Sequence, residues 1–516
     1  DQLEVHVDRH VHLSIYLYYG AARVKDTNVL QHQDIVITTY STMAADYKRS
    51  QTGRGQVSPL KKVRWLRVVL DEGHAIRNPQ SQQSKAIMEL EAERRWVLTG
   101  TPIQNSIKDL WSLINFLKVT PFTDQQWWRR TIERPLEKGE DSALKRVQHL
   151  MGHLALRRTK TQTVDGKPLV ELPKRQVCIE HITLSQEERT VYDAMQKEGK
   201  LIVSKYFKQG TLLHHYGDVL AILMRLRQLC CHPFLVAKAA EAVKETLGEL
   251  SSCDGALSEE MRMKLIGTLI TVLGSGTDEE CAVCLDALSL LSETRGRHPR
   301  CPLCRGDVDA DKLLEVPAEE DLEQEANGSP AIAAESWKSS AKADALMNSI
   351  LKLRVEDPAI KSVVVSQFTS FLNVLEHPLT ANGFRFVRLN GSMNQKSRTE
   401  AIEEFSNPCA GSPTIMLLSL KAGGVGINLT AASRVFLLDP AWNPASEEQC
   451  FDRCHRLGQT RDVVITKYIV EDSVEERMLQ LQEKKLHLMQ GAFGQKQSAE
   501  ERRQKRILDI KSLLNL

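Results

Sequence analysis

Apolar and polar positions alternate in two stretches of the chain in a way that predicts short buried strands separated by helices. In residues 1–130, a helical period over 84–93 lies among strand candidates at 34–40, 68–70 and 96–98. In residues 336–485, a helical pattern at 341–353 precedes strand candidates at 363–365, 415–418, 435–438 and 464–469. This order is typical of parallel sheets with helices on both faces, so we expect an α/β fold.

The segment between these stretches has a different pattern. Residues 103–250 are mostly helical in period. Cys230, Cys231 and His232 lie in this segment and suggest a metal site or a nucleophile. Adjacent cysteines have poor ligand spacing, however, and the surrounding helix is apolar, so we expect these side chains to pack in a core.

Composition limits the class of protein. With 516 residues, 42% of them apolar, the chain can bury two or three domain cores. The net charge of +2 gives no global field for nucleic acid, so any basic surface must be local. No apolar run approaches the roughly 18 residues of a membrane span and no signal peptide opens the chain, which favours a reducing compartment. The first residue is Asp rather than Met, so we expect a fragment or a processed product.

Polar loops follow two of the predicted strands in the first stretch, where ligands bind in such folds. Asp71, directly after the strand at 68–70, can hold Mg²⁺ through water, and Glu72 can orient or deprotonate an attacking water. A Thr-Gly-Thr-Pro sequence follows the strand at 96–98, and its small residues from Thr99 to Thr101 let the backbone approach a ligand closely. An ordinary acidic loop and a plain turn are the alternatives.

A glycine-rich segment follows the strand predicted at 415–418. Gly423, Gly424 and Gly426 free the backbone to approach a phosphate with its amide groups. Such a run is common in loops of other kinds.

An arginine pair lies further along, in the sequence QCFDRCHRLGQ at 449–459. On a helix, the spacing puts the guanidinium groups of Arg453 and Arg456 on one face, together with Gln449. A row of planar cations suits a polyphosphate that gains charge in its transition state. The alternative is an exposed helix with surface arginines.

Two CxxC pairs predict a zinc site. Sixteen residues separate the pair Cys281 and Cys284 from the pair Cys301 and Cys304, a spacing that fits four thiolate ligands, and His298 is an alternative ligand. Free thiols in a loop are the other interpretation. Acidic and small residues flank the pairs, and residues 317–334 look like a flexible linker.

Taken in order, these motifs resemble the Swi/Snf-type DNA-dependent ATPases of helicase superfamily two. The resemblance covers nearly the whole chain and rests on DEGH with the following AIRN, TGTP, VVVSQF, SLKAGGVGINL, DPAWNP and the HRLGQ ending of the arginine motif. The cysteine cluster resembles a RING finger. The family implies an α/β fold of two RecA-like lobes that close on ATP and Mg²⁺, with duplex DNA across both. The RING members of the family also bind Zn²⁺.

The resemblance also assigns roles to residues. Asp71 would hold the Mg²⁺-bound water, Glu72 would act on the hydrolytic water, and Arg453 and Arg456 would contact the γ-phosphate. The remaining positions would contact DNA or couple its binding to the nucleotide: His74, Thr99, Thr101, Ser419, Lys421, Gly423, Gly424, Gly426 and Gln449. Implied partners are double-stranded DNA, replication forks and chromatin in the nucleus, without a membrane. RING members transfer ubiquitin with an E2 enzyme, in particular to the sliding clamp.

The expected domains follow from the pattern and the resemblance. They are a partial first lobe at 1–130, a helical protrusion or insertion at 131–250, a truncated RING-type finger and acidic linker at 251–335, the second lobe at 336–485, and a basic C-terminal helix at 486–516.

Two features depart from the family pattern. No GxxxxGK[ST] loop occurs in these 516 residues, so we expect the chain by itself to hydrolyse little ATP. The RING-type cluster lacks the middle ligands of a complete one, so its two CxxC pairs either belong to different zinc ions or meet on one. An inactive adaptor that binds DNA or chromatin is therefore the alternative function.

Overall fold

The computed structural model describes residues 7–236, 338–491, 508 and 511–514, with gaps at 9, 21–22, 25, 52–56, 101–106, 138–139, 157, 159, 161, 165, 210–215, 392, 410 and 424–425. The chain divides between residues 156 and 157 into two compact units. We describe each unit by itself.

The first unit contains two parallel strand pairs. Strand β1 (Ile15–Tyr18) pairs with β2 (Ile35–Thr38), and β3 (Trp65–Leu70) pairs with β4 (Ala92–Val97). These pairs confirm the strands predicted near 34–40, 68–70 and 96–98. The helix predicted over 84–93 is shorter, because α5 (Gln82–Met88) ends before β4 begins.

Short helices pack against these strands around one apolar core. The core includes Tyr18, Leu30, Ile76, Ile87 and Phe116, each at most 4% exposed. The helices and the 3₁₀ turn that contribute to this part are α2 (Thr27–Gln31), α3 (Tyr40–Gln51), α4 (Pro59–Lys62), η1 (Gly73–Ile76) and α6 (Ile107–Phe116). The core fixes the strand ends from which the polar loops emerge.

The rest of the first unit is helical. Helix α7 (Gln125–Trp128) continues into a π-helix, η2 (Arg129–Glu133), then α8 (Arg134–Glu137) and α9 (Asp141–Leu154). A separate core joins them to α6 through Trp111, Ile114, Trp128, Ile132 and Val147.

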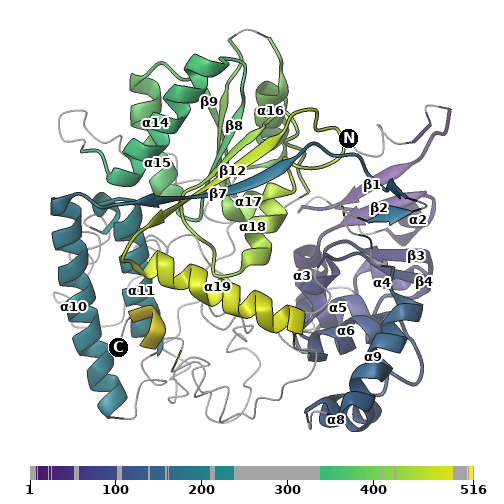
Figure 1. The fold of residues 1–516 in the computed structure, drawn as a ribbon. Coiled ribbons are helices and arrows are strands. Elements are labelled where there is room, and N and C mark those ends of the chain that lie inside the picture. Colours follow the sequence, from purple (N-terminus) through teal and green to yellow (C-terminus); the bar gives the residue numbers. More distant parts are fainter. Residues whose placement is uncertain are drawn as a thin grey trace, which may run out of the picture. The chain divides into compact units, whose positions relative to one another are not determined.

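The second unit is built on a six-stranded sheet, whose order is β7-β12-β11-β8-β10-β9 (Figure 1). Every neighbouring pair is parallel. The strands are β7 (Arg175–Ile182), β8 (Ser362–Ser366), β9 (Phe386–Leu389), β10 (Ile415–Ser419), β11 (Arg434–Leu437) and β12 (Val463–Val470). The predicted parallel α/β architecture is therefore confirmed for this unit.

Helices cover both faces of this sheet, as the burial of its central strand shows. Val364 belongs to one apolar core, while Val363 and Val365 belong to the other. Successive side chains of a strand point to opposite faces, so both faces of β8 are buried. The helices are α10 (Gln186–Lys208), α11 (Tyr216–Cys231), α14 (Ala341–Glu356), α15 (Thr369–Ala381), α16 (Gln395–Ser406), α17 (Leu420–Gly423), α18 (Pro444–Phe451) and α19 (Val474–Gly491).

Strand β7 lies where the sequence pattern predicted mostly helix, and that prediction is wrong for residues 175–182. The strand pairs with β12 along its full length, from Arg175 opposite Val463 to Ile182 opposite Val470. The partner strand lies almost 300 residues later, so local periodicity could not reveal the pairing. Strand β7 and helices α10 and α11, which precede the cysteine segment in the sequence, therefore belong to the second unit together with the described elements that follow it.

Residues 231–232 and 338–340, which are far apart in the sequence, lie beside each other in the second unit. The ring Nε2 of His232 lies 2.9 Å from the carbonyl oxygen of Lys338, and the hydroxyl of Ser340 donates to the carbonyl of Cys231 at 2.9 Å. Cys230 and Cys231 are buried free thiols, and burial raises the pKa of Cys230 to about 12. The expected role of these cysteines in core packing is confirmed.

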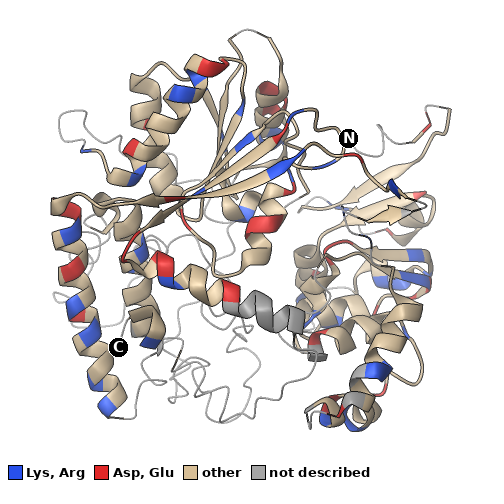
Figure 2. Cartoon of the chain, in the orientation of Figure 1, with Lys and Arg blue, Asp and Glu red and all other residues tan. Residues whose placement is uncertain are grey.

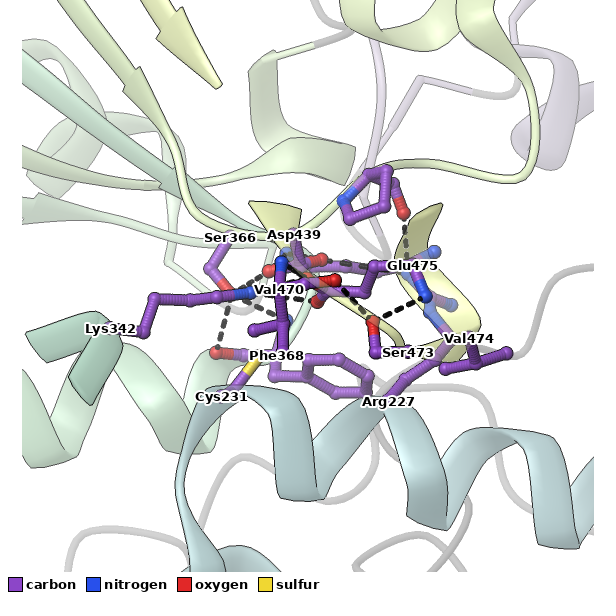
Figure 3. A network of polar contacts seen from close by, with 12 residues as sticks. Arg227, Cys231, Lys342, Ser366, Phe368, Asp439, Val470, Ser473, Val474 and Glu475 are labelled. Atoms are coloured by element: carbon purple, nitrogen blue, oxygen red, sulfur yellow. Dashed lines mark hydrogen bonds and ion pairs between the residues drawn. The ribbon is translucent and has the colours of Figure 1, made fainter. Parts of the chain in front are cut away.

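Buried charged side chains join helices of the second unit to one another and to the chain that follows β11 (Figure 3). The ammonium of Lys342, on α14, donates to both carboxylate oxygens of Glu475 at 2.7 Å, and both side chains are fully buried. The guanidinium of Arg227, on α11, lies 3.7 Å from Asp439 and donates to the carbonyl of Pro440 at 2.6 Å. Burial raises the pKa of Glu475, against the effect of the adjacent ammonium.

Charged residues of both signs are interspersed over the described elements (Figure 2). This distribution agrees with the small net charge of +2. Within the part of the chain that the structure describes, no helix combines the length and apolar character needed to cross a membrane.

Candidate active site

The acidic turn of the first unit forms where β3 ends. Its residue Asp71 is exposed, and the Asp71 Oδ1 accepts the backbone N–H of Glu72 at 3.0 Å. Glu72 adopts a left-handed backbone conformation, with φ 47° and ψ 47°. Such a conformation is unfavourable for a residue with a long side chain, by roughly 1–2 kcal/mol. Strain of this kind is typical of functional turns.

Close packing beside the turn requires a glycine. The backbone N–H of Gly73 donates to the carbonyl of Leu98 at 2.8 Å, which joins the turn to the loop after β4. A Cβ atom on Gly73 would overlap the Cγ1 atom of Val97. The absence of a side chain at position 73 therefore lets the two strand ends approach each other.

His74 connects the two polar loops. Its Nδ1 atom lies 3.4 Å from the Glu72 carboxylate and 3.3 Å from the Thr99 hydroxyl. Burial lowers the pKa of His74, and Arg77 adds to this effect, while Asp71 opposes it. The neutral imidazole is thus favoured. Its Nδ1 atom can form a hydrogen bond with either the Glu72 carboxylate or the Thr99 hydroxyl. The structure brings together the predicted residues Asp71, Glu72, His74 and Thr99.

Tyr40 also supports the acidic turn, a role that the sequence pattern alone does not reveal. Its hydroxyl donates to the backbone carbonyl of Asp71 at 2.8 Å. Burial raises the pKa of Tyr40, and the charges of Asp71 and Glu72 raise it further, so the hydroxyl remains a donor. The available sequence signal was its position at the exit of a predicted strand, where ligand-binding loops begin.

In the second unit, the glycine-rich segment leaves the sheet at the end of β10. Ser419 is buried, and its Oγ accepts the backbone N–H of Ala422 at 3.3 Å, which starts the short helix α17. Lys421 and Gly426 are exposed. Gly423 is buried, and a Cβ atom there would lie 2.7 Å from the sulfur of Cys450. The glycine therefore allows α17 to pack against α18.

The arginine pair does not lie on a helix, and our expectation of a shared helical face is wrong. Helix α18 carries Gln449 but ends at Phe451, and turns follow it. Beyond the helix, the N–H of Arg453 donates to the carbonyl of Cys450 at 3.1 Å, and the N–H of Leu429 donates to the carbonyl of Arg453 at 3.0 Å.

These turns nevertheless bring both arginines to the glycine-rich segment. The Arg453 Nε donates to the carbonyl of Gly423 at 3.2 Å, and the Arg456 Nη1 donates to the carbonyl of Ile427 at 3.4 Å. Both side chains are half-buried. Two guanidinium groups therefore flank a glycine-rich backbone, an arrangement that suits an anionic phosphate ligand.

Side chains from distant parts of the second unit hold the arginine turn in place. Lys160 donates to the Asp452 carboxylate and to the His455 carbonyl, each at 2.6 Å. The buried amide of Gln459 donates to the carbonyls of Ala432 at 2.8 Å and Cys454 at 2.9 Å. From its composition, the basic sequence at 156–160 suits either a phosphate contact or a solvated surface. In the structure, Lys160 of this sequence forms an ion pair with Asp452.

Several predicted residues lie outside the described residues. They are Thr101, Gly424 and the expected zinc ligands Cys281, Cys284, His298, Cys301 and Cys304. Across the described ranges, no group of three or more His, Cys, Asp or Glu side chains is arranged to hold a metal ion.

Comparisons with known proteins agree with these motifs. The SNF2-related domain family matches residues 1–235, and the helicase conserved C-terminal domain family matches residues 341–458. Helicase-like transcription factor of Oryctolagus cuniculus is 52% identical over 100% of this chain and 51% of that protein. DNA repair protein RAD5A of Arabidopsis thaliana is 38% identical over 97% of this chain and 50% of that protein.

A solved structure, the C-terminal part of the Fun30 ATPase domain, is 23% identical to this chain. It covers 67% of this chain and 99% of its own, with a TM-score of 0.41. The chain spans about half the length of the curated relatives it matches.

A parallel α/β unit with a glycine-rich loop and paired arginines, preceded by a unit with an acidic turn at a strand end, defines a helicase-like protein of superfamily two. Within that class, the chain belongs to the Swi/Snf, or SNF2-related, family.

Proposed function

We propose that the chain is part of an ATP-dependent translocase that acts on double-stranded DNA. The observation that supports this function best is the position of His74, whose Nδ1 atom lies within 3.4 Å of the Glu72 carboxylate and within 3.3 Å of the Thr99 hydroxyl. Glu72 would act on the attacking water, and the loop at Thr99 would sense DNA. A neutral imidazole in contact with both can link DNA binding to the position of the carboxylate.

The residues present fit ATP with Mg²⁺. Asp71 is exposed at the carboxyl end of β3, and carboxylate oxygen is the ligand that Mg²⁺ prefers. When bound, the metal neutralises charge on the phosphates. In our proposal, Glu72 orients the attacking water, and Arg453 and Arg456 stabilise the negative charge that develops on the phosphoryl group.

The test is DNA-stimulated ATP hydrolysis by the protein as its cells make it. We expect Glu72→Gln to reduce the rate about 10²–10⁴-fold and Arg453→Ala to reduce it about 10³-fold or more. Glu198→Gln, which changes an exposed carboxylate on α10 in the same way, serves as the control and should retain full activity. Full activity in Glu72→Gln would reject the assignment.

The alternative is an adaptor that binds DNA or chromatin without hydrolysing ATP. The observation in its favour is that the 516 residues contain no GxxxxGK[ST] loop. Photo-crosslinking with labelled ATP separates the two functions, because the adaptor would remain unlabelled.

We also propose that the two CxxC pairs bind Zn²⁺ and that an E2 enzyme and the sliding clamp are partners. The support is the spacing of Cys281, Cys284, Cys301 and Cys304, which suits a thiolate site. Cys284→Ser should lower the zinc content measured by mass spectrometry and abolish E2-dependent ubiquitin chain formation. Unchanged values would reject this part of the proposal. Action at chromatin and replication forks in the nucleus belongs to the same proposal.

A further inference from the structure

The helical part of the first unit contains a pocket that the proposed motor function does not use. Its volume is about 500 Å³, a size typical of ligand sites. The pocket lies among α7, η2 and α9 and is lined by Phe122, Trp127, Ile132, Lys145, Arg146, His149 and Leu150.

Aromatic and aliphatic side chains form the interior of this pocket. Phe122 packs edge-to-face against Trp127, with 5.1 Å between ring centroids, and also lies 6.1 Å from Trp128. Ile132 and Leu150 complete the apolar wall. A ligand that enters this space must be apolar itself, because a polar group without hydrogen-bond partners there would lose its hydration.

The π-helix η2 shapes one wall of the pocket. Residues 129–133 form this rare element, which occurs often at functional sites. The guanidinium of Arg146 holds it to α9, since its Nη1 donates to the carbonyl of Thr131 at 3.1 Å and its Nε donates to the carbonyl of Ser142 at 3.2 Å. The wall is therefore fixed without a ligand.

The rim of the pocket is basic. Lys145 and His149 are exposed on α9 beside Arg146, and no acidic side chain occurs among the described lining residues. The nearby Asp124 is engaged as the N-cap of α7, where it accepts the N–H of Gln126 at 2.8 Å. An apolar interior with a basic rim complements an apolar side chain with carboxylates next to it.

We propose that this pocket binds a partner protein through one bulky apolar side chain flanked by acidic residues. The apolar side chain fills the space between Phe122, Trp127 and Leu150, and the flanking carboxylates meet Lys145 and His149. Nucleic acid fits less well, because the interior offers no polar partners for a base edge and Arg146 is already engaged with the backbone.

A defined peptide tests the proposal on the full chain. The probe is a fluorescein-labelled peptide with one phenylalanine between two pairs of aspartates, measured by fluorescence anisotropy. We expect a Kd of roughly 10–100 μM, weakened about tenfold or more when alanine replaces the phenylalanine. Asparagine in place of the aspartates should weaken binding about 3- to 10-fold, and so should added salt.

Charge-reversal variants locate the binding site. Lys145→Glu combined with His149→Glu changes only exposed side chains, so the fold is retained, and peptide affinity should fall at least tenfold. Lys197→Glu on α10 is the matched control and should leave affinity unchanged.

Three results would overturn the proposal. The first is the absence of saturable binding up to about 1 mM peptide. The second is equal peptide affinity in the double variant. The third is a labelled DNA duplex whose affinity falls in the double variant while peptide binding does not, which would assign the surface to nucleic acid. None of these results bears on ATP hydrolysis.

Discussion

Two pairs of polar side chains differ in their exposure to solvent. Lys342 and Glu475 of the second unit are buried, whereas Glu72 and His74 of the first unit are partly exposed. The Lys342–Glu475 pair is fully buried, with two hydrogen bonds of 2.7 Å. The Glu72 side chain is 39% exposed and that of His74 is 20% exposed, with contacts of 3.3–3.4 Å. The buried pair is satisfied by the protein, whereas the acidic turn keeps its polar atoms accessible for a ligand.

Burial distinguishes charged side chains that stabilise the fold from charged side chains that remain available for chemistry. Buried ions must be paired because an unpaired charge costs several kcal/mol, so their partners come from distant elements that the fold has already fixed. Charges available for chemistry remain near solvent and are positioned by backbone features, here a left-handed turn and a close-packed glycine. Changes to the two groups should therefore affect different measurements.

The largest expected effect comes from breaking the buried pair. Lys342→Met leaves the Glu475 carboxylate buried without its cation, and we expect the free energy of unfolding to fall by about 3–5 kcal/mol in urea denaturation. The exposed pair Lys396 and Glu400 is the control, because Lys396→Met should change it by less than about 0.5 kcal/mol. Combining Lys342→Met with Glu475→Leu should recover most of the loss. A loss no greater than that of Lys396→Met would show that the buried charges are not paired.

A smaller effect is expected at the close approach beside the acidic turn. Gly73→Ala should destabilise the first unit by about 1–3 kcal/mol, since the added methyl group overlaps Val97. Gly152→Ala is the matched control, because no atom lies within 4 Å of the position that its Cβ would take and alanine favours the helix. If Val97→Ala does not reduce the cost of Gly73→Ala in a double-mutant cycle, the contact does not constrain the turn.

A substitution that relieves the strain at the acidic turn should increase stability while it removes activity. Asparagine tolerates the left-handed conformation better than glutamate, so Glu72→Asn should raise the free energy of unfolding by up to about 1 kcal/mol. The same change removes the carboxylate and should abolish DNA-stimulated hydrolysis. A variant that loses both stability and activity would indicate that Glu72 is held by structural contacts instead.

The smallest effect is a dependence of stability on pH at His74. Burial lowers the pKa of His74 in the folded protein, so the unfolded chain binds the proton more readily. This contribution to stability is complete above the ordinary histidine pKa of about 6.5 and is lost as pH falls below it. Thermal unfolding from pH 7.5 to 5 should show a shallower decline for His74→Gln than for the unchanged protein. Identical slopes would contradict the shift.

Much of the architecture followed from local patterns, as particular strands show. The apolar runs at 363–365 and 415–418 predicted β8 and β10 because central parallel strands are apolar on both faces. The sequence at 175–182 did not predict β7, because β7 lies at the edge of the sheet and many of its side chains are partly exposed. The loops at 71–74 and 99–100 could be located from the strands before them. Their residues' chemical roles remain predictions.

The sequence by itself determined the family, the α/β class and the identity of the polar loops, because these depend on residue order and short-range periodicity. Only the tertiary structure decided which residues meet. Arg453 and Arg456 reach the glycine-rich segment through turns, Tyr40 supports Asp71 across 31 positions, and Lys342 pairs with Glu475 across 133. The physical reason is that such contacts come from the packing of whole elements, whose energy is spread over many side chains and leaves no local pattern in the chain.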